Sequence, residues 1–159
     1  MIYHAHKRII AVSPYFVPDE SMLMALTSAA YGGIDVQLYV NEESDQFMVG
    51  HAQQSYYQAL LTAGVKIYRY PAPAVLHSKF MVIDDRMAMF GSSNLDMRSF
   101  GLNYEITLLS AAGSIVDKLI TLADEYRDKS LLLTQEEWND RPLRQRYLDS
   151  VFRLTSALQ

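Results

Sequence analysis

The chain has 159 residues, of which 50% are hydrophobic and 20% are charged, a composition typical of one soluble globular domain. It contains no cysteine, which excludes disulfides and thiolate metal sites. A formal net charge of -4 gives no overall attraction to nucleic acid or anionic lipid, although a local basic patch is compatible with it. A nucleic-acid partner is therefore not favoured, and no apolar run is long enough to span a bilayer.

Apolar runs separated by turn residues predict that strands and helices alternate over the first half of the chain. Asp19 is expected to cap a helix that runs to about Tyr31, and a second helix is expected to end at about Ala63. The one histidine of that second helix, His51, is predicted to be a surface residue. This order predicts an α/β fold, in which a mixed β-sheet is flanked by helices on both faces. The predicted strands of this part are residues 8–13, 35–40 and 65–70.

The residues with the clearest chemistry begin at His77. His77 and Lys79 are two apart, so both point to the same face of a strand predicted over residues 77–83. A neutral imidazole beside a fixed cation suits attack on a phosphoryl group, or proton delivery to one. Asp84 falls on the opposite face of this strand, so we expect it to brace the site from behind rather than to touch substrate.

A hairpin is predicted to return the chain beside this strand. Residues 85–86 occupy the expected two-residue turn, although they lack the glycine that such turns favour, and residues 87–90 form the returning strand. A Gly-Ser-Ser-Asn turn follows at residues 91–94. Its glycine allows a close approach of the backbone, and Ser92 and Asn94 can donate hydrogen bonds to phosphate oxygens.

A further strand is predicted over residues 103–108, after a connection in which Asp96 and Arg98 are expected to pair. Glu105 on this strand could accept a hydrogen bond from the His77 ring and fix its tautomer. Each residue alone has an ordinary structural explanation, since a lone histidine is more often structural and Gly-Ser-Ser-Asn is an ordinary turn. The joint spacing H-x-K-x4-D-x6-G-S-x-N is long and chemically coherent, so chance matches are rare.

The rest of the chain is predicted to be helical. Ser114 is expected to cap a helix that runs to about Lys129, and residues 134–137 form a capping box. A helical extension is expected at about 134–159, where apolar positions repeat on one side of a last helix. This helix either lies on a membrane surface or docks on the domain with a solvated basic face, and docking is the favoured interpretation. Its arginines are Arg141, Arg144, Arg146 and Arg153.

These motifs resemble a known family, the phospholipase D superfamily. Glu105 falls where the supporting glutamate of that family lies, and more specifically the chain is similar to the C-terminal half of bacterial cardiolipin synthases. The resemblance covers nearly the whole chain and implies a single phospholipase D-like domain over residues 1–159. Residues that match the His-Lys-Asp signature of the superfamily are His77, Lys79, Asp84, Gly91, Ser92 and Asn94. The stretches that carry the cardiolipin synthase likeness are residues 13–20, 55–57, 64–68 and 94–100.

The resemblance implies transfer of a phosphatidyl group between two phosphatidylglycerol molecules through a phosphohistidine, which yields cardiolipin and glycerol. It assigns catalysis to His77, Lys79 and Asp84, phosphate binding to Ser92 and Asn94, and a supporting role to Glu105, with no metal or other cofactor. The first histidine of such enzymes is generally the nucleophile, which would make His77 the general acid and base. Localisation at the cytoplasmic membrane is expected for the full-length protein, whereas this fragment alone is expected to be soluble.

The chain departs from the family in carrying one motif where the enzymes use two. We therefore expect its partner to be an N-terminal half that carries the other motif, or a second copy in a homodimer. Two alternatives to a synthase half stay open. The chain could be a homodimeric single-motif phosphodiesterase that acts as a phospholipase D or a nuclease, or a non-catalytic interaction module that keeps only the fold.

Overall fold

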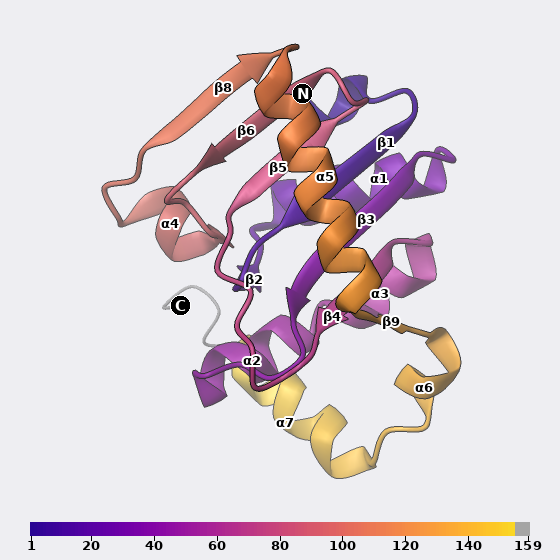
Figure 1. Ribbon diagram of the computed structural model, residues 1–159. Helices are drawn as coiled ribbons and strands as arrows, with labels where there is room; N and C mark the ends of the chain where they lie inside the picture. Colours follow the sequence, from indigo (N-terminus) through magenta and orange to yellow (C-terminus); the bar gives the residue numbers. More distant parts are fainter. Residues whose placement is uncertain (155–159) are drawn as a thin grey trace.

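A seven-stranded mixed sheet forms the centre of the computed structural model (Figure 1), which describes the backbone of residues 1–154 and their side chains except that of Arg146. The strand order is β8-β6-β5-β1-β3-β4-β9, in which β1, β3 and β4 are parallel and all other neighbours are antiparallel. The predicted fold class is confirmed. The strands are β1 (Arg8–Val12), β3 (Asp35–Asn41), β4 (Lys66–Tyr70), β5 (Phe80–Ile83), β6 (Met87–Gly91), β8 (Thr107–Ala111) and β9 (Leu131–Leu133).

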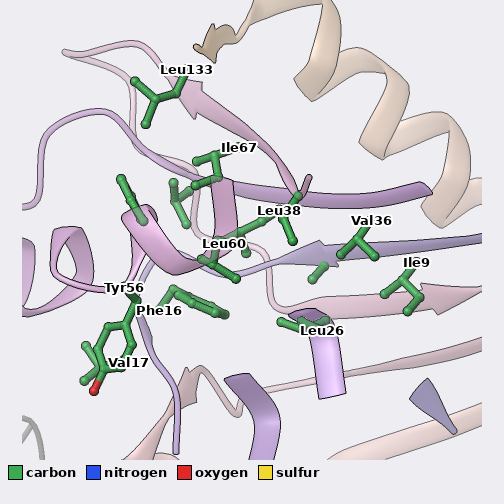
Figure 2. Packing of buried hydrophobic residues seen from close by; sticks show 14 of the residues in the cluster. Ile9, Phe16, Val17, Leu26, Val36, Leu38, Tyr56, Leu60, Ile67 and Leu133 are labelled. Carbon is green, nitrogen blue, oxygen red and sulfur yellow. The ribbon is translucent and has the colours of Figure 1, made fainter. Parts of the chain in front are cut away.

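Helices cover both faces of the sheet (Figure 1). Helices α1 (Glu20–Tyr31), α2 (Phe47–Gln54) and α3 (Tyr57–Ala63) lie on one face, and α5 (Ser114–Lys129) lies on the other. Alternate residues of β1 supply the two cores, because successive side chains of a strand point to opposite faces. Ile9 packs in the core shown in Figure 2, together with Leu26 of α1 and Leu60 of α3, whereas Ile10 packs beneath α5.

The helices of the first half differ from the prediction in one respect. Asp19 caps α1 as expected, since its carboxylate accepts a hydrogen bond from the Met22 amide at 2.8 Å. The single helix predicted to end at Ala63 is wrong, because α2 and α3 are separated by a turn at residues 55–56. The Ser55 hydroxyl donates to the Ala52 carbonyl at 2.6 Å, and such local side-chain bonds compete with the helical pattern.

A second, two-stranded sheet ties two loops together at one edge of the main sheet. Strand β2 (Phe16–Val17) follows β1 and pairs in parallel with β7 (Leu95–Asp96), which follows β6. The short helix α4 (Met97–Gly101) begins after Asp96, whose carboxylate accepts from the Ser99 amide at 2.6 Å. The expected ion pair between Asp96 and Arg98 is absent from the described ion pairs, and Asp96 instead caps the helix that carries Arg98.

The C-terminal segment docks on the domain rather than standing away from it. Thr134 caps α6 (Gln135–Asn139) by accepting from the Glu137 amide, and α7 (Leu143–Arg153) packs against α2. Only this half of the predicted capping box forms, because the Glu137 carboxylate binds Arg69 instead. His51 on α2 binds the buried Asp149 on α7 with an Nδ1–Oδ1 distance of 2.8 Å, so the prediction that His51 is a surface residue is wrong. The predicted extension continues to residue 159, and its last five residues lie outside those that the structure describes.

Within residues 1–154, no helix is both long enough and apolar enough to cross a bilayer.

Candidate active site

His77 and Lys79 lie side by side just before β5, at the edge of the sheet where β1 ends. The strand was predicted to begin at His77 but begins at Phe80, and residues 75–79 run along the edge as an irregular segment. Lys79 Nζ nevertheless lies 3.2 Å from His77 Nε2 and 2.8 Å from the His77 carbonyl oxygen. An ammonium group can only donate, so in this contact His77 Nε2 is the acceptor.

Two neighbours of His77 fix the segment to the fold and leave the imidazole itself exposed. The buried Leu76 exchanges two hydrogen bonds with the buried side chain of Asn41, which closes β3: its amide donates to Oδ1 at 2.7 Å and its carbonyl accepts from Nδ2 at 3.1 Å. On the other side of His77, the Ser78 hydroxyl lies 2.7 Å from the Tyr126 hydroxyl of α5. Neither Asn41 nor Tyr126 was predicted as a site residue. A polar residue at the end of an otherwise buried strand is the one signal that pointed to Asn41.

Gly91 brings the second wall of the site against the first. The Gly91 amide donates to the Lys79 carbonyl at 3.2 Å, and Gly91 pairs with Thr107 on β8. A Cβ atom at this position would lie 2.0 Å from the Ile106 carbonyl oxygen, so only glycine permits this approach. Residues 92–94 are thereby held next to Lys79.

Ser92 and Glu105 are linked to each other rather than to His77. The Ser92 hydroxyl donates a short hydrogen bond to the Glu105 carboxylate and accepts from the Ile106 amide at 3.1 Å, while Asn103 Nδ2 donates to Glu105 at 3.3 Å. The expected hydrogen bond from the His77 ring to Glu105 is absent from the described contacts. The cause lies in the strand boundaries, since the strand predicted over 103–108 begins at Thr107 and leaves Glu105 in the loop before it.

An electrostatic interaction links the hydrogen-bonded pair of Ser92 and Glu105 to Lys79. The hydrogen bond from Ser92 is the main reason that the pKa of Glu105 is lowered, and the Lys79 charge lowers it further. Partial burial lowers the pKa of Lys79, which the nearby carboxylates of Glu105 and Asp96 oppose. The site thus combines one ammonium group with nearby carboxylates whose charge partly offsets the effect of burial on its pKa.

Asn94 lies beside these groups with an unused polar atom. Its backbone amide donates to the Ser99 hydroxyl at 3.2 Å, which fixes the start of α4 against the turn. Its side-chain Oδ1 is buried and has no hydrogen-bond partner among the residues that the structure describes. Most buried polar atoms have a partner, so this position is suited to receive one from a ligand or another chain.

Asp84 does not lie with the other predicted site residues. It sits at the far end of β5, where its carboxylate accepts hydrogen bonds from the backbone amides of His6, Lys7 and Arg8. Burial opposes its ionisation, but these three amides outweigh burial and lower the pKa of Asp84. The structure therefore brings His77, Lys79, Ser92, Asn94 and Glu105 to one edge, and leaves Asp84 at the opposite one.

The turn that holds Asp84 also differs from the prediction. It was expected at residues 85–86, but its central residues are Asp84 and Asp85, with φ of 53° and 58°, and the Arg86 amide donates to the Ile83 carbonyl at 3.1 Å. The turn therefore sits one residue earlier than predicted. Aspartate tolerates this left-handed conformation better than most residues, which explains a tight hairpin without glycine.

An apolar cavity of about 490 Å³ opens beside Lys79 on the α1 side of the sheet. Its walls come from α1, from the first residues of the chain, and from the strands that carry the site. The lining includes Met22, Phe80, Met89, Phe90 and Phe100. Among the residues that the structure describes, no group of three or more carboxylate or imidazole side chains is placed to hold a metal ion.

Comparison with known sequences relates nearly the whole chain to one group of proteins. A family model described as "Cardiolipin synthase, PLD-like domain" matches residues 1–127. Cardiolipin synthase A of Yersinia pseudotuberculosis is 40% identical over 157 residues, which make up 99% of this chain and 32% of that protein. Cardiolipin synthase A of Yersinia pestis matches to the same extent. The chain thus spans about a third of the length of the curated relatives it matches.

Solved structures with the same fold are more distant in sequence. Nuc of Salmonella typhimurium, a phospholipase D family member, superposes with a TM-score of 0.72 at 16% identity and covers 84% of this chain and 86% of its own. Phosphatidylserine synthase of Haemophilus influenzae superposes with a TM-score of 0.75 at 15% identity, over 99% of this chain and 43% of its own. At such identities these matches show a shared fold.

Proposed function

The chain belongs to the phospholipase D-like family of cardiolipin synthases, and on that premise we propose that it supplies one half of a two-histidine phosphatidyltransferase site. The observation that carries the proposal is the exposed His77 imidazole 3.2 Å from Lys79, with Ser92 and Asn94 alongside. The donor and the acceptor are both phosphatidylglycerol, and the products are cardiolipin and glycerol. The complete protein acts at the cytoplasmic membrane, where this substrate lies.

In the first step, the histidine of the other half attacks the phosphorus atom of the donor lipid. A phosphorus–nitrogen bond forms, the bond from phosphorus to the glycerol oxygen breaks, and protonated His77 gives its proton to the departing oxygen. Lys79 and the Asn94 amide group stabilise the charge on the equatorial phosphate oxygens. Glycerol leaves, and His77 is left neutral.

In the second step, neutral His77 takes the proton from a headgroup hydroxyl of the acceptor lipid. The oxygen attacks phosphorus, the phosphorus–nitrogen bond breaks, and cardiolipin forms while His77 regains the proton it needs for the next cycle. Without substrate, His77 Nε2 accepts from Lys79, so this role requires the Lys79 ammonium group to turn to the phosphate and free Nε2 to carry the proton.

Asp84 has no part in these steps. Its hydrogen bonds to the backbone of residues 6–8 support a structural role, in which it fastens the start of the chain to the turn after β5. Ser92 and Glu105 act as a pair. The carboxylate orients the hydroxyl and makes the electrostatic potential around Lys79 more negative.

An exposed apolar surface beside the site supports a partner chain that completes it. Large side chains of the loop after α4 and of the edge strand β8 are open to solvent, and apolar patches of this kind mark protein interfaces. We assign this surface to the segment that carries the second motif, with a second copy of this chain as the other candidate. The residues are Leu102, Tyr104, Ile106, Leu108 and Leu109.

A chimera tests the proposed function. This chain replaces its matching third of the Yersinia pseudotuberculosis cardiolipin synthase A, and cardiolipin is measured from phosphatidylglycerol vesicles. We expect the chimera to be active, and we expect His77→Ala or Lys79→Ala to lower kcat by about 10²- to 10⁴-fold, the usual contribution of an acid–base group.

The matched control is Tyr31→Ala, an exposed residue on α1 outside the site and its cavity, which should leave kcat unchanged. A chimera that keeps its rate after His77→Ala, while Tyr31→Ala behaves in the same way, contradicts the proposal and favours a non-catalytic module.

A further inference from the structure

Helix α7 carries an apolar stripe on the face that points away from the protein. At about 100° per residue, Leu143, Tyr147, Val151 and Leu154 fall within roughly 80° of the helix circumference. All four side chains are exposed, Val151 least at 40% and Leu154 most at 85%. Nothing within residues 1–154 packs over this stripe, which is unusual for four large apolar residues on one helix face.

The opposite face of α7 is firmly held, so the stripe is not exposed by loose docking. Asp149 is buried and bridges two elements, binding His51 of α2 and Arg141, each at 2.8 Å. The Phe152 ring stacks on His51 and meets Phe47 edge-on, at centroid distances of 5.5 and 5.6 Å. The helix is therefore fixed in one rotation, with its inward face used and its stripe outward.

Positive charge borders the stripe. Residues 141–154 contain four arginines and one aspartate, although the whole chain has a net charge of -4, so cationic side chains are concentrated in this short segment. Arg144 is exposed beside the stripe, whereas Arg141 binds Asp149 and the Arg153 guanidinium lies 5.1 Å from the centre of the Tyr56 ring. Apolar residues beside an exposed cation match the boundary of an anionic bilayer, with acyl chains beneath a layer of phosphates.

The position of α7 relates this surface to the site. Strand β3 ends at Asn41, which contacts Leu76 next to His77, and the chain then runs directly into α2, on which α7 packs. Figure 1 shows α2 and α7 at the end of the sheet toward which β1 and β3 run. A bilayer that receives the stripe therefore lies against the same edge of the molecule as His77 and Lys79.

We propose that the outward face of α7 (Leu143, Tyr147, Val151, Leu154 and the adjacent Arg144) is a contact surface for an anionic phospholipid bilayer, which brings the site to its substrate. The inference rests on the proposed function in one respect, that the substrate is a membrane lipid. Binding itself requires no turnover, so the two proposals are tested by different measurements.

The test is flotation of the 159-residue chain with vesicles of phosphatidylcholine alone or of equal parts phosphatidylcholine and phosphatidylglycerol. We expect binding to the anionic vesicles to be at least about tenfold stronger, and to weaken as salt is raised. The double variant Tyr147→Ser/Val151→Ser should lose about tenfold or more in affinity for the anionic vesicles, because it removes the centre of the stripe. Arg144→Gln should lose about fivefold on anionic vesicles alone.

The matched control removes the same kind of exposed side chains from another helix. Met24 and Tyr31 on α1 are also exposed, and Met24→Ser/Tyr31→Ser should bind like the unsubstituted chain. Near-ultraviolet circular dichroism of Trp138, which Arg141 covers at the base of α7, reports that each variant keeps the docked helix.

Equal binding by the Tyr147→Ser/Val151→Ser variant and the unsubstituted chain overturns the inference, as does equal binding to neutral and anionic vesicles. It is also overturned if the unsubstituted chain ignores vesicles but sediments as a dimer that this variant dissociates, since the stripe is then an interface between proteins. An inactive chimera that still binds anionic vesicles through α7 sinks the proposed function and leaves this inference standing. An active chimera, together with an α7 variant that binds anionic vesicles normally, overturns this inference and leaves the proposed function standing.

Discussion

At the scale of single residues, the site depends on partners that lie far away in the sequence. His77 itself makes few contacts, and its position is set by the bonds that Asn41 makes to Leu76 and that Tyr126 makes to Ser78. Exposure leaves the imidazole open to substrate, while the two anchored neighbours limit how far its backbone can move. This arrangement combines access with a fixed geometry, and catalysis depends on both.

Replacing Asn41 with alanine should therefore harm both stability and turnover. The variant leaves the buried amide and carbonyl of Leu76 without partners, which should lower the free energy of unfolding by about 1–3 kcal/mol. In the chimera we expect kcat to fall by about tenfold or more with a smaller change in KM, because His77 is displaced and not removed. Asn139→Ala, the loss of an exposed amide on α6, is the control, and an Asn41→Ala chimera with normal kcat would show that the anchor does not position His77.

Asp84→Asn separates a structural role from a catalytic one. The pKa of Asp84 is lowered in the folded state, so its ionised form stabilises the fold above the pKa of the unfolded carboxyl, about 3.9. That stabilisation is lost as the pH falls through the lower folded value. Urea unfolding at pH 7 should show a loss of about 1 kcal/mol for Asp84→Asn, and this loss should shrink as the pH is lowered below about 4.

The chimera with Asp84→Asn should keep its kcat, since the carboxylate lies at the opposite edge from His77. A kcat that falls as far as in His77→Ala, with the stability unchanged, would restore Asp84 to the catalytic residues.

Single residues also show what the sequence could and could not predict about the site. The contact between His77 and Lys79 was predictable, because a separation of two residues places both side chains on one side of any extended segment. Asn41 and Tyr126 were not predictable as anchors, since each meets its partner across a gap of 35 or 48 residues that no local pattern reveals. The contact of Glu105 with Ser92, instead of with His77, was likewise not predictable, because no local pattern reveals it.

At the scale of elements, close contact between β6 and β8 shapes the second wall of the site. Gly91 lies at the end of β6, directly against the Ile106 carbonyl, and this approach sets where Ser92 and Asn94 fall relative to Lys79. The small two-stranded sheet of β2 and β7 then holds the following residues against the end of β1, aided by the Ser13 hydroxyl, which accepts from the Leu95 amide at 3.0 Å.

Gly91→Ala should push the two strands apart. Its Cβ meets backbone, which cannot swing away as a side chain can, so we expect a loss of about 1–3 kcal/mol in the free energy of unfolding. Ser92 should move with the strand and lower the kcat of the chimera. Gly101→Ala is the matched control, because a Cβ there meets nothing within 4 Å. Equal melting temperatures for the two variants would contradict the clash.

Elements with a continuous apolar run or a clear cap were predictable, and short or exposed ones were not. The apolar run of β1 and the aspartate before α1 predicted both elements nearly to the residue. Strands β2 and β7 have two residues each, too few for any period, and β9 has three. Edge strand β8 is exposed on both faces, so it lacks the polar and apolar alternation by which a half-buried strand is identified.

At the scale of the whole molecule, the β8 edge of the sheet is open. Large apolar side chains of β8 and of the loop before it are exposed to solvent, on the side of the sheet that carries the β5–β6 hairpin and the one His-Lys pair. A site with one histidine cannot both attack phosphorus and protonate the leaving group in a single step. The single motif, evident from the sequence, and the open edge, evident only from the structure, together support a site that another polypeptide segment completes.

The most direct measurement is cardiolipin formation from radiolabelled phosphatidylglycerol by the 159-residue chain, first alone and then with the remaining N-terminal part of the Yersinia pseudotuberculosis cardiolipin synthase A. Sedimentation under the same conditions reports whether the chain is a monomer. We predict no cardiolipin above background from the chain alone, and cardiolipin once the second half is added, lost again with His77→Ala. Rapid cardiolipin formation by a chain that sediments as a monomer would contradict the account, because half a site would then suffice.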